Sequence, residues 1–324
     1  MAAKFIGRRL AVGIGKEITR GTEVVPSYWL GVTSFSFFDK AIKARSIAST
    51  GGIWGGDQAL VAREYAEGEM EIEMDDKSFG LIMLATLGTV SSVQVGATTA
   101  YKHTYTLQND SSHDSLSIHT ADPIGDNAFK MSMVDNISME FSPEELVKYT
   151  VGFKSKSSIL SSSTASYVAN NKFLGRQLSV KIADAVAGLD AATSLTLSMA
   201  SINIAKNTEL YNVVGTVQPS DINNKTFEIT GELEISFDDT TYRDYMLDGS
   251  YKALRFDLVS DVAIGTGSNP SFRIDLPRVD FDAWDVDYSL DDIVKQTITF
   301  TALYDMTTSK IINDCYIINE AVSY

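Results

Sequence analysis

The three histidines are the residues whose type and spacing first suggest chemistry. His103, His113 and His119 lie in one stretch of the chain, with aspartates nearby. Imidazole and carboxylate groups together can bind a transition metal ion. The stretch contains neither a helical HxxxH pair nor a cysteine that could complete such a site. We therefore expect these histidines to occupy strand and turn positions of an exposed sheet, and we predict no metal and no cofactor.

Adjacent carboxylates are the second candidate for chemistry, because paired acids can act as general acid and base. Asp75 is followed by Asp76, and Asp238 is followed by Asp239. Both pairs lie where a strand pattern changes into a helix pattern, and an aspartate at that place caps a helix. The sequence also contains no Ser/His/Asp order and no helical Glu-His pair. We predict that the chain is not an enzyme.

The elements that hold these aspartates follow the same plan twice. In segments 68–86 and 231–249, apolar residues first alternate mostly with glutamate, which is the period of a half-buried strand. After the aspartates the apolar spacing becomes helical. The positions that share one helix face are Phe79, Ile82 and Met83 in the first segment and Tyr242, Tyr245 and Met246 in the second. We expect Gly88 to end the first helix.

Two further pairs of segments match in the same order. Residues 4–14 match 172–182 with an offset of 168, and residues 141–153 match 288–300 with an offset of 147. The offset of the helix segments is 163, so the three blocks are collinear. This order predicts an internal duplication.

The domain boundary is expected in a serine-rich stretch, because such stretches form flexible connections. Seven of the twelve residues from 155 to 166 are serine. We predict a first domain at residues 1–157, a linker at 158–169 and a second domain at 170–324. Each domain is expected to be mainly β, a sandwich with one flanking helix.

Composition excludes several classes of protein. The 324 residues, 44% of them hydrophobic, are enough for two globular domains. The single cysteine, Cys315, excludes an intramolecular disulfide and predicts a reducing compartment. No apolar run approaches the roughly 18 residues of a membrane span, so no membrane partner is expected. The net charge of −15 is opposite in sign to that of a surface that grips DNA phosphates.

A β-rich duplicated chain must deal with its open sheet edges. Edges can be paired with those of another copy, and a cyclic assembly of many strands closes into a wide barrel around a water-filled channel. Acids that alternate with apolar residues would suit the wall of such a channel and would repel nucleic acid. The candidates for this lumen-facing position are Glu69, Glu71, Glu73, Glu232 and Glu234.

Several motifs resemble those of tail tube proteins of long-tailed bacteriophages. They are residues 13–17, residues 21–22, Pro26 to Trp29, the strand and helix at 68–88, His103 to Tyr105, and the closing hairpins with Leu276 and Pro277. The resemblance covers most of the chain. It implies rings that stack into a hollow tube, which conducts DNA from the capsid to the host.

The resemblance also implies partners and a place of assembly. Such tubes have six subunits per ring, so a duplicated chain is expected to form a ring of three chains with pseudo-sixfold symmetry; a true hexamer stays the alternative. Further partners would be the stacked rings, the tape measure, terminator and distal tail proteins, and genomic DNA that passes without sequence-specific binding. The protein would assemble in the host cytoplasm and reside in the virion tail.

A long segment at residues 39–58 is the candidate for contact between rings, with residues 1–20 as a second arm. The segment has no turns of its own, and long loops of this kind are usually functional or mobile. Its candidate contact residues are Ile42, Arg45, Ile53 and Trp54. Trp54 stands between glycine pairs and could either anchor an arm or pack under its own loop.

Two alternatives remain at the level of the sequence. A tube protein of a contractile tail or of a secretion-like injection system would share the fold and differ in an outer surface fitted to a sheath. A carbohydrate-binding or adhesive β protein would need exposed aromatic residues near a tip, for which only Trp54 is a candidate.

Overall fold

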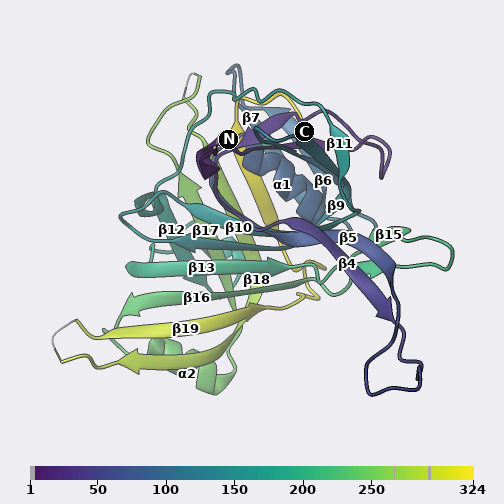
Figure 1. Ribbon diagram of the computed structural model, residues 1–324. Coiled ribbons are helices and arrows are strands. Elements are labelled where there is room, and N and C mark those ends of the chain that lie inside the picture. Colours follow the sequence, from purple (N-terminus) through teal and green to yellow (C-terminus); the bar gives the residue numbers. More distant parts are fainter. Residues whose placement is uncertain (1–3, 266, 291–292) are drawn as a thin grey trace.

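The computed structural model describes residues 4–265, 267–290 and 293–324. The protein is mainly β, with 51% of residues in strands and 8% in helices. Figure 1 shows long strands crossing the middle of the molecule and a hairpin that projects away from it. Within the described residues the α-helices are α1 (Ser78–Leu87) and α2 (Thr241–Asp248).

The first half of the chain contains eleven strands and α1. The strands are β1 (Ala11–Lys16), β2 (Tyr28–Leu30), β3 (Val32–Phe35), β4 (Phe38–Arg45), β5 (Ala59–Glu73), β6 (Gly88–Gln94), β7 (Tyr101–Leu107), β8 (Leu116–Ala121), β9 (Asp126–Phe141), β10 (Lys148–Ser155) and β11 (Ile159–Ser161). All their pairings are antiparallel, in the order β1, β8, β9, β10, β5, and β5 continues to β3 and β4. The short β11 lies at the start of the predicted linker and pairs with β9.

The second half of the chain repeats this order of pairing. Its strands are β12 (Leu178–Ala183), β13 (Leu197–Ala205), β14 (Glu209–Tyr211), β15 (Asp221–Asn223), β16 (Glu228–Ser236), β17 (Lys252–Val259), β18 (Ser271–Asp287), β19 (Lys295–Ala302) and β20 (Asp314–Asn319). The order is β12, β17, β18, β19, β16, and β16 continues to β13. In the first half β6 and β7 stand between α1 and β8, whereas α2 is followed directly by β17. The last strand, β20, joins β18 to β7.

One sheet runs through both halves because β13 pairs with β9. The strands lie in the order β4, β5, β10, β9, β13, β16, β19 and β18. Directly opposed residues of antiparallel strands share a face. One row across a face is Glu71, Thr150, Ser138, Asn203, Thr230, Thr301 and Asp280, and the opposite face includes a row with Ile72, Tyr149, Met139, Ile202, Phe300 and Phe281. The second row is buried, so one face of the sheet is polar and the other covers the core.

Helix α1 begins and ends as predicted, but its surroundings differ from the prediction. The carboxylate of Asp75 accepts hydrogen bonds from the amides of Lys77 (2.9 Å) and Ser78 (2.7 Å), which caps the helix. Gly88 ends it with a left-handed backbone, φ 95°. All ten residues of α1 are buried, so the expectation of a flanking helix with one apolar face is wrong here. A helix that is apolar on all sides belongs inside the core.

Helix α2 is a flanking helix, as expected. Asp239 accepts a hydrogen bond from the amide of Thr241 (2.9 Å), and the helix has no fully buried residue. Tyr245 stacks on Phe281, on the apolar face of the sheet, with 5.9 Å between the ring centroids. The same strand-helix unit is therefore enclosed in the first half and lies at the surface in the second.

Candidate functional site

The polar face of the eight-stranded sheet carries the predicted acidic residues. Glu71 lies on β5, where the Thr33 hydroxyl donates a hydrogen bond to Oε2 (2.8 Å) and Lys148 Nζ lies 3.7 Å from Oε1. Thr33 is the extra residue of a β-bulge between β3 and β5. The bulge turns the Thr33 hydroxyl toward Glu71, so that it can donate this hydrogen bond.

The second half has the same arrangement at Glu234 on β16. The hydroxyl of Ser198, again the extra residue of a bulge, donates to Glu234 Oε1, and Lys295 Nζ lies 2.9 Å from the same oxygen. The hydrogen bond from Ser198 and then that from Lys295 lower the pKa of Glu234, and burial opposes them. Both partners favour the charged carboxylate, so Glu234 remains ionised at neutral pH.

The other predicted acids differ in their partners. Glu73 forms an ion pair with Lys172, with 3.0 Å between Oε2 and Nζ. Glu69 and Glu232 have no ion-pair partner within the part of the chain that the structure describes. All five acids lie on one face, but three are paired with lysines, so the unbalanced charge of the group rests on Glu69 and Glu232.

The segment at 39–58 is a hairpin rather than a long loop. Its first part belongs to β4, which pairs with β5 from Phe38 opposite Glu67 to Arg45 opposite Ala59. All eight residues of β4 are exposed, so the strand is held by pairing and not by burial, and its sequence has no alternation that could have revealed it. Figure 1 shows β4 and β5 extending from the body of the molecule to the loop at their end.

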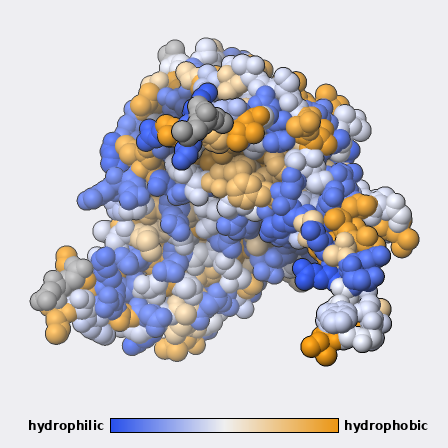
Figure 2. Space-filling model, viewed as in Figure 1, coloured by the Kyte–Doolittle hydropathy of each residue, from blue (hydrophilic) through white to orange (hydrophobic). Residues whose placement is uncertain are grey.

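The predicted contact residues lie along this hairpin. Ile42 and Arg45 are exposed on β4, and Ile53 and Trp54 belong to the loop at its end. Trp54 Nε1 donates a hydrogen bond to the Thr50 hydroxyl (2.8 Å), yet 70% of the Trp54 surface is exposed. In Figure 2 the end of this hairpin, at lower right, is mostly pale, which marks intermediate hydropathy, with a hydrophobic patch at its tip. Trp54 is therefore fixed by its own loop and still presents its ring to the outside.

The three histidines are buried, so the expectation of an exposed sheet is wrong for them. His103 contacts the side chains of Ser92 (2.8 Å) and Asn319 (3.0 Å), His113 the carbonyl oxygens of Thr86 and Gln108, and His119 that of Val24. Burial lowers the pKa of His103 and His113. Among the described residues, no cluster of three or more metal-ligating side chains is present.

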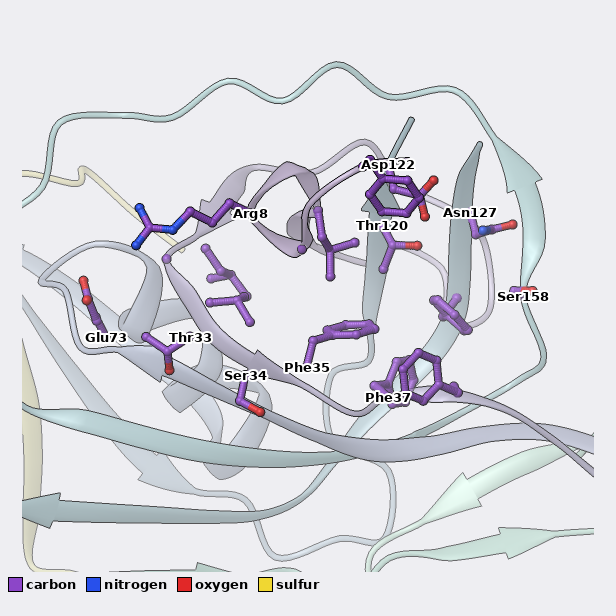
Figure 3. A pocket seen from close by; sticks show the side chains of 18 of the residues that line it. Arg8, Thr33, Ser34, Phe35, Phe37, Glu73, Thr120, Asp122, Asn127 and Ser158 are labelled. Atoms are coloured by element: carbon purple, nitrogen blue, oxygen red, sulfur yellow. The ribbon is translucent and has the colours of Figure 1, made fainter. Parts of the chain in front are cut away.

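A cavity of about 1070 Å³ lies beside β3, at the edge of the sheet. In Figure 3, Arg8 and Glu73 lie on one side of it and Asn127 and Ser158 on the other, with the rings of Phe35 and Phe37 between them. No local sequence pattern predicts this cavity. Its lining comes from segments far apart in the chain, which only the fold brings together.

The comparison with known families identifies the family of this chain. A family described as phage tail tube protein matches residues 7–302. The chain belongs to the family of phage tail tube proteins. No curated protein matches the chain. The match covers both halves, including the eight-stranded sheet and the projecting hairpin.

Membership of this family makes the chain a structural protein of the phage, located in the virion tail. The expected resemblance is thereby confirmed. Within the described residues, neither helix of this tail tube protein has the length and apolarity needed to cross a membrane.

Proposed function

We propose that three copies of this tail tube protein form a ring in which their sheets join into one barrel, and that stacked rings form the tube that conducts DNA. The observation that carries the proposal is the pairing of β9 with β13. It joins the two halves edge to edge within one chain, and the outer ends of the same sheet have matching open edges.

The proposal includes an internal duplication, which the strand registers support. In the hairpin β9–β10, Lys148 lies opposite Glu140, and a bulge omits Asp135. In the hairpin β18–β19, Lys295 lies opposite Asp287, and a bulge omits Asp282. Every position follows the offset of 147 residues. The bulges at Thr33 and Ser198 also correspond, with an offset of 165. A shared bulge position is difficult to explain by chance, because bulges are specific features of a fold.

The open edges make the ring geometry specific. In β9, residues 133–140 have β10 on one side, and residues 136–141 have β13 on the other. In β18, the equivalent residues 280–287 pair only with β19, within the described chain. At the opposite end of the sheet, β3 and β4 pair only with β5 there. The edge of β18 in one copy would therefore pair with β3 and β4 of the next, as β9 pairs with β13.

The two halves together favour three chains over six. Each chain supplies two equivalent four-stranded units, so three chains give the six units that the ring is expected to contain. Closure removes both open edges, which are otherwise sites of aggregation. The polar face, with its carboxylates, would then line the channel, and the apolar face would lie toward the core. A surrounding sheath would leave this arrangement unchanged.

A disulfide across the proposed junction tests the ring. Glu140 lies opposite Ser201 at the internal junction, and the equivalent residues at the outer edges are Asp287 and Ser36. We expect the double variant Ser36→Cys with Asp287→Cys to give covalent rings of three chains on a denaturing, non-reducing gel. The matched control, Glu140→Cys with Ser201→Cys, should form its disulfide within one chain.

The gel also separates the alternatives. A covalent ladder that extends to six chains would favour the hexamer. Only single chains from the outer pair, with a complete disulfide in the control, would contradict the proposed edge pairing. Negative-stain microscopy of the reduced protein should show rings or tubes with a central channel.

A further inference from the structure

The cavity beside β3 corresponds to a place that is filled in the second half of the chain. The cavity is lined by Gly7, Val32 and Phe35, whose counterparts are Gly175, Leu197 and Ala200. Beside these counterparts the equivalent space is occupied by Phe141 of the first half, which lies opposite Ala200 and is only 3% exposed. The space beside β3 is therefore empty at the edge of the molecule, and the equivalent space at its centre is occupied.

The turn that follows β9 closes this central contact. A Cβ atom on Gly175 would come 2.0 Å from the carbonyl oxygen of Ser142, so the turn touches the backbone there. The Gly175 amide also donates a hydrogen bond to the Glu145 carbonyl (3.0 Å), and the Val147 amide donates to that of Phe173 (2.9 Å). Phe173 is 1% exposed as a result. The turn between β9 and β10 is thus docked on segment 173–175.

The corresponding residues at the edge of the molecule are uncovered. A Cβ atom on Gly7 would meet nothing within 4 Å, and Phe5, the counterpart of Phe173, is 39% exposed. The Val147 amide and the Met74 carbonyl both form hydrogen bonds with the backbone of Phe173. Their counterparts at the edge are the Val294 amide and the Phe237 carbonyl. Neither makes a backbone hydrogen bond of this kind within the described chain. These groups are available for another strand.

The residue that would fill the cavity is exposed at the far end of the same sheet. Tyr288 follows β18 and is the counterpart of Phe141; it is 66% exposed. It contacts Phe237 edge-on, with 6.3 Å between ring centroids. Leu290, two residues further on, is 99% exposed. An aromatic ring beside an exposed apolar side chain is typical of the centre of a protein-protein contact.

We propose that Tyr288 of one copy inserts into the cavity beside β3 of a second copy, with the backbone at Ser289, the counterpart of Ser142, resting on Gly7. The occupant is a second copy of this chain, since the same chain already fills the equivalent place with Phe141. This inference rests on the proposed ring and specifies the side chain that locks each junction. Phe5 of the second copy then lies against the backbone beside Phe237, as Phe173 lies against that beside Met74.

The first test blocks the proposed contact at Gly7. Because a side chain at Gly7 meets open space in the single chain and its φ is not in the left-handed region, Gly7→Leu should leave folding unchanged and raise the concentration at which rings dissociate by at least tenfold. Gly55 is equally uncrowded but lies in the hairpin loop, so Gly55→Leu is the matched control and should retain ring formation. Native mass spectrometry on dilution gives the dissociation, and the thermal unfolding temperature of the single chain verifies folding.

The second test removes the inserted ring. Tyr288→Ala should weaken the ring by at least tenfold, whereas Tyr288→Phe, which introduces the residue found at the internal junction, should dissociate as the unmodified protein does. Hot-spot aromatic residues commonly have effects of this size.

The outcomes separate this inference from the proposed ring. If the unmodified protein forms rings, and the rings of Gly7→Leu and Tyr288→Ala are equally stable, the insertion of Tyr288 is overturned and the proposed ring still stands. An unmodified protein that forms no rings would overturn both. Weakened rings in both variants, with normal rings in Gly55→Leu and Tyr288→Phe, are the expected result.

Discussion

Single residues connect the two halves, and the buried Lys206 is the clearest case. It follows β13 in the second half, and its Nζ donates a hydrogen bond to the carbonyl oxygen of Ala85 in α1 of the first half (2.8 Å). The lysine is fully buried. Burial, and then the charge of Arg20, lower its pKa to about 7, against the opposing effects of Asp135 and Asp114. A helix carbonyl near the C-terminus of α1 is a favourable partner for such a group.

The low pKa of Lys206 predicts a pH dependence of stability. In the folded protein the pKa of this lysine is about 7, whereas the ordinary pKa of a lysine is 10.5. Between these values the unfolded chain binds more protons, so the free energy of unfolding increases with pH, by up to about 1.4 kcal/mol per pH unit from this group. We expect Lys206→Met to lose this increase. Chemical denaturation of both proteins from pH 7 to 8.5 measures the difference.

The control for this measurement is an exposed lysine. Lys225 is 54% exposed at its side chain and pairs with Glu209, so Lys225→Met should keep the pH dependence of the unmodified protein. The measurements end at pH 8.5 because burial raises the pKa of Cys315. Above about pH 9 this thiol would make the free energy of unfolding decrease with pH, opposite to the effect of Lys206. Parallel curves for Lys206→Met and the unmodified protein would show that Lys206 is charged in the folded state.

At the scale of elements, the alternation of apolar and acidic residues was sufficient to predict β5, β16 and the face that each buries. Met70 and Ile72 point into the core, and Glu69 and Glu71 lie on the other face. The caps of the helices could be predicted from the aspartates and Gly88, because capping is a local interaction. The enclosure of α1 follows from its uniformly apolar sequence, because a helix without a polar face belongs inside the core.

Other features depended on contacts that no local pattern encodes. β4 has only exposed residues, so its strand state comes from pairing with β5. The partners of the acidic residues, Thr33 and Ser198, are placed by bulges, and a bulge is a property of the paired strands rather than of one segment. The cavity beside β3 is an absence of contacts within one chain, and its meaning emerges only when the two halves are compared.

The projecting hairpin predicts a separation of ring formation from stacking. The Ser46 amide donates a backbone hydrogen bond of 2.9 Å to the Gln58 carbonyl oxygen where the loop at the end of the hairpin begins. Replacing residues 47–57 by Asn-Gly would close the hairpin with a two-residue turn while β4 and β5 remain paired. We expect this variant to form three-chain rings that do not stack into tubes, because the exposed Ile53 and Trp54 are removed. Negative-stain microscopy distinguishes rings from tubes.

A point substitution gives the matched comparison for the shortened hairpin. Trp54→Ala keeps the loop and removes the exposed ring, so it should give shorter tubes than the unmodified protein at equal concentration. Tubes of ordinary length from the shortened hairpin would assign stacking to another surface. Residues 11–16 of the arm predicted at 1–20 cannot supply that surface, because they form β1, which is paired with β2 and β8 and is mostly buried.

At the scale of the whole molecule, charge follows the two faces of the sheet. The protein carries a net charge of −15, and the polar face contains carboxylates on β5, β9, β16 and β18. Lysines pair with Glu71, Glu73 and Glu234, whereas Glu69 and Glu232 have no ion-pair partner in the described part of the chain. In the proposed tube these two acids would repeat around every ring. A channel wall with this charge would repel phosphates, so DNA would pass along it without adhering.

The charge of the wall predicts the effect of one substitution on DNA passage. Glu232 lies on the polar face of β16 and has no ion-pair partner among the described residues, so Glu232→Lys should leave the fold and the ring intact. The new lysine would attract phosphate in each ring, and the effect would multiply along the tube. We expect slower ejection of DNA from particles assembled with this variant, measured as fluorescence of a DNA-binding dye after ejection is triggered. Because salt screens the attraction, ejection should recover as ionic strength increases.

An acid on the opposite side of the sheet separates this effect from the change in net charge. Asp248 is exposed at the end of α2, which packs on the apolar face through Tyr245 and Phe281. Asp248→Lys changes the charge of the chain by the same amount, but outside the proposed channel, so ejection should proceed at the unmodified rate. If both variants slowed ejection equally, or if Glu232→Lys had no effect at low salt, the polar face would not line the path of the DNA. Slowing by Glu232→Lys alone would assign that face to the channel, because only a residue in contact with the passing phosphates can have an effect that depends on its position and on salt.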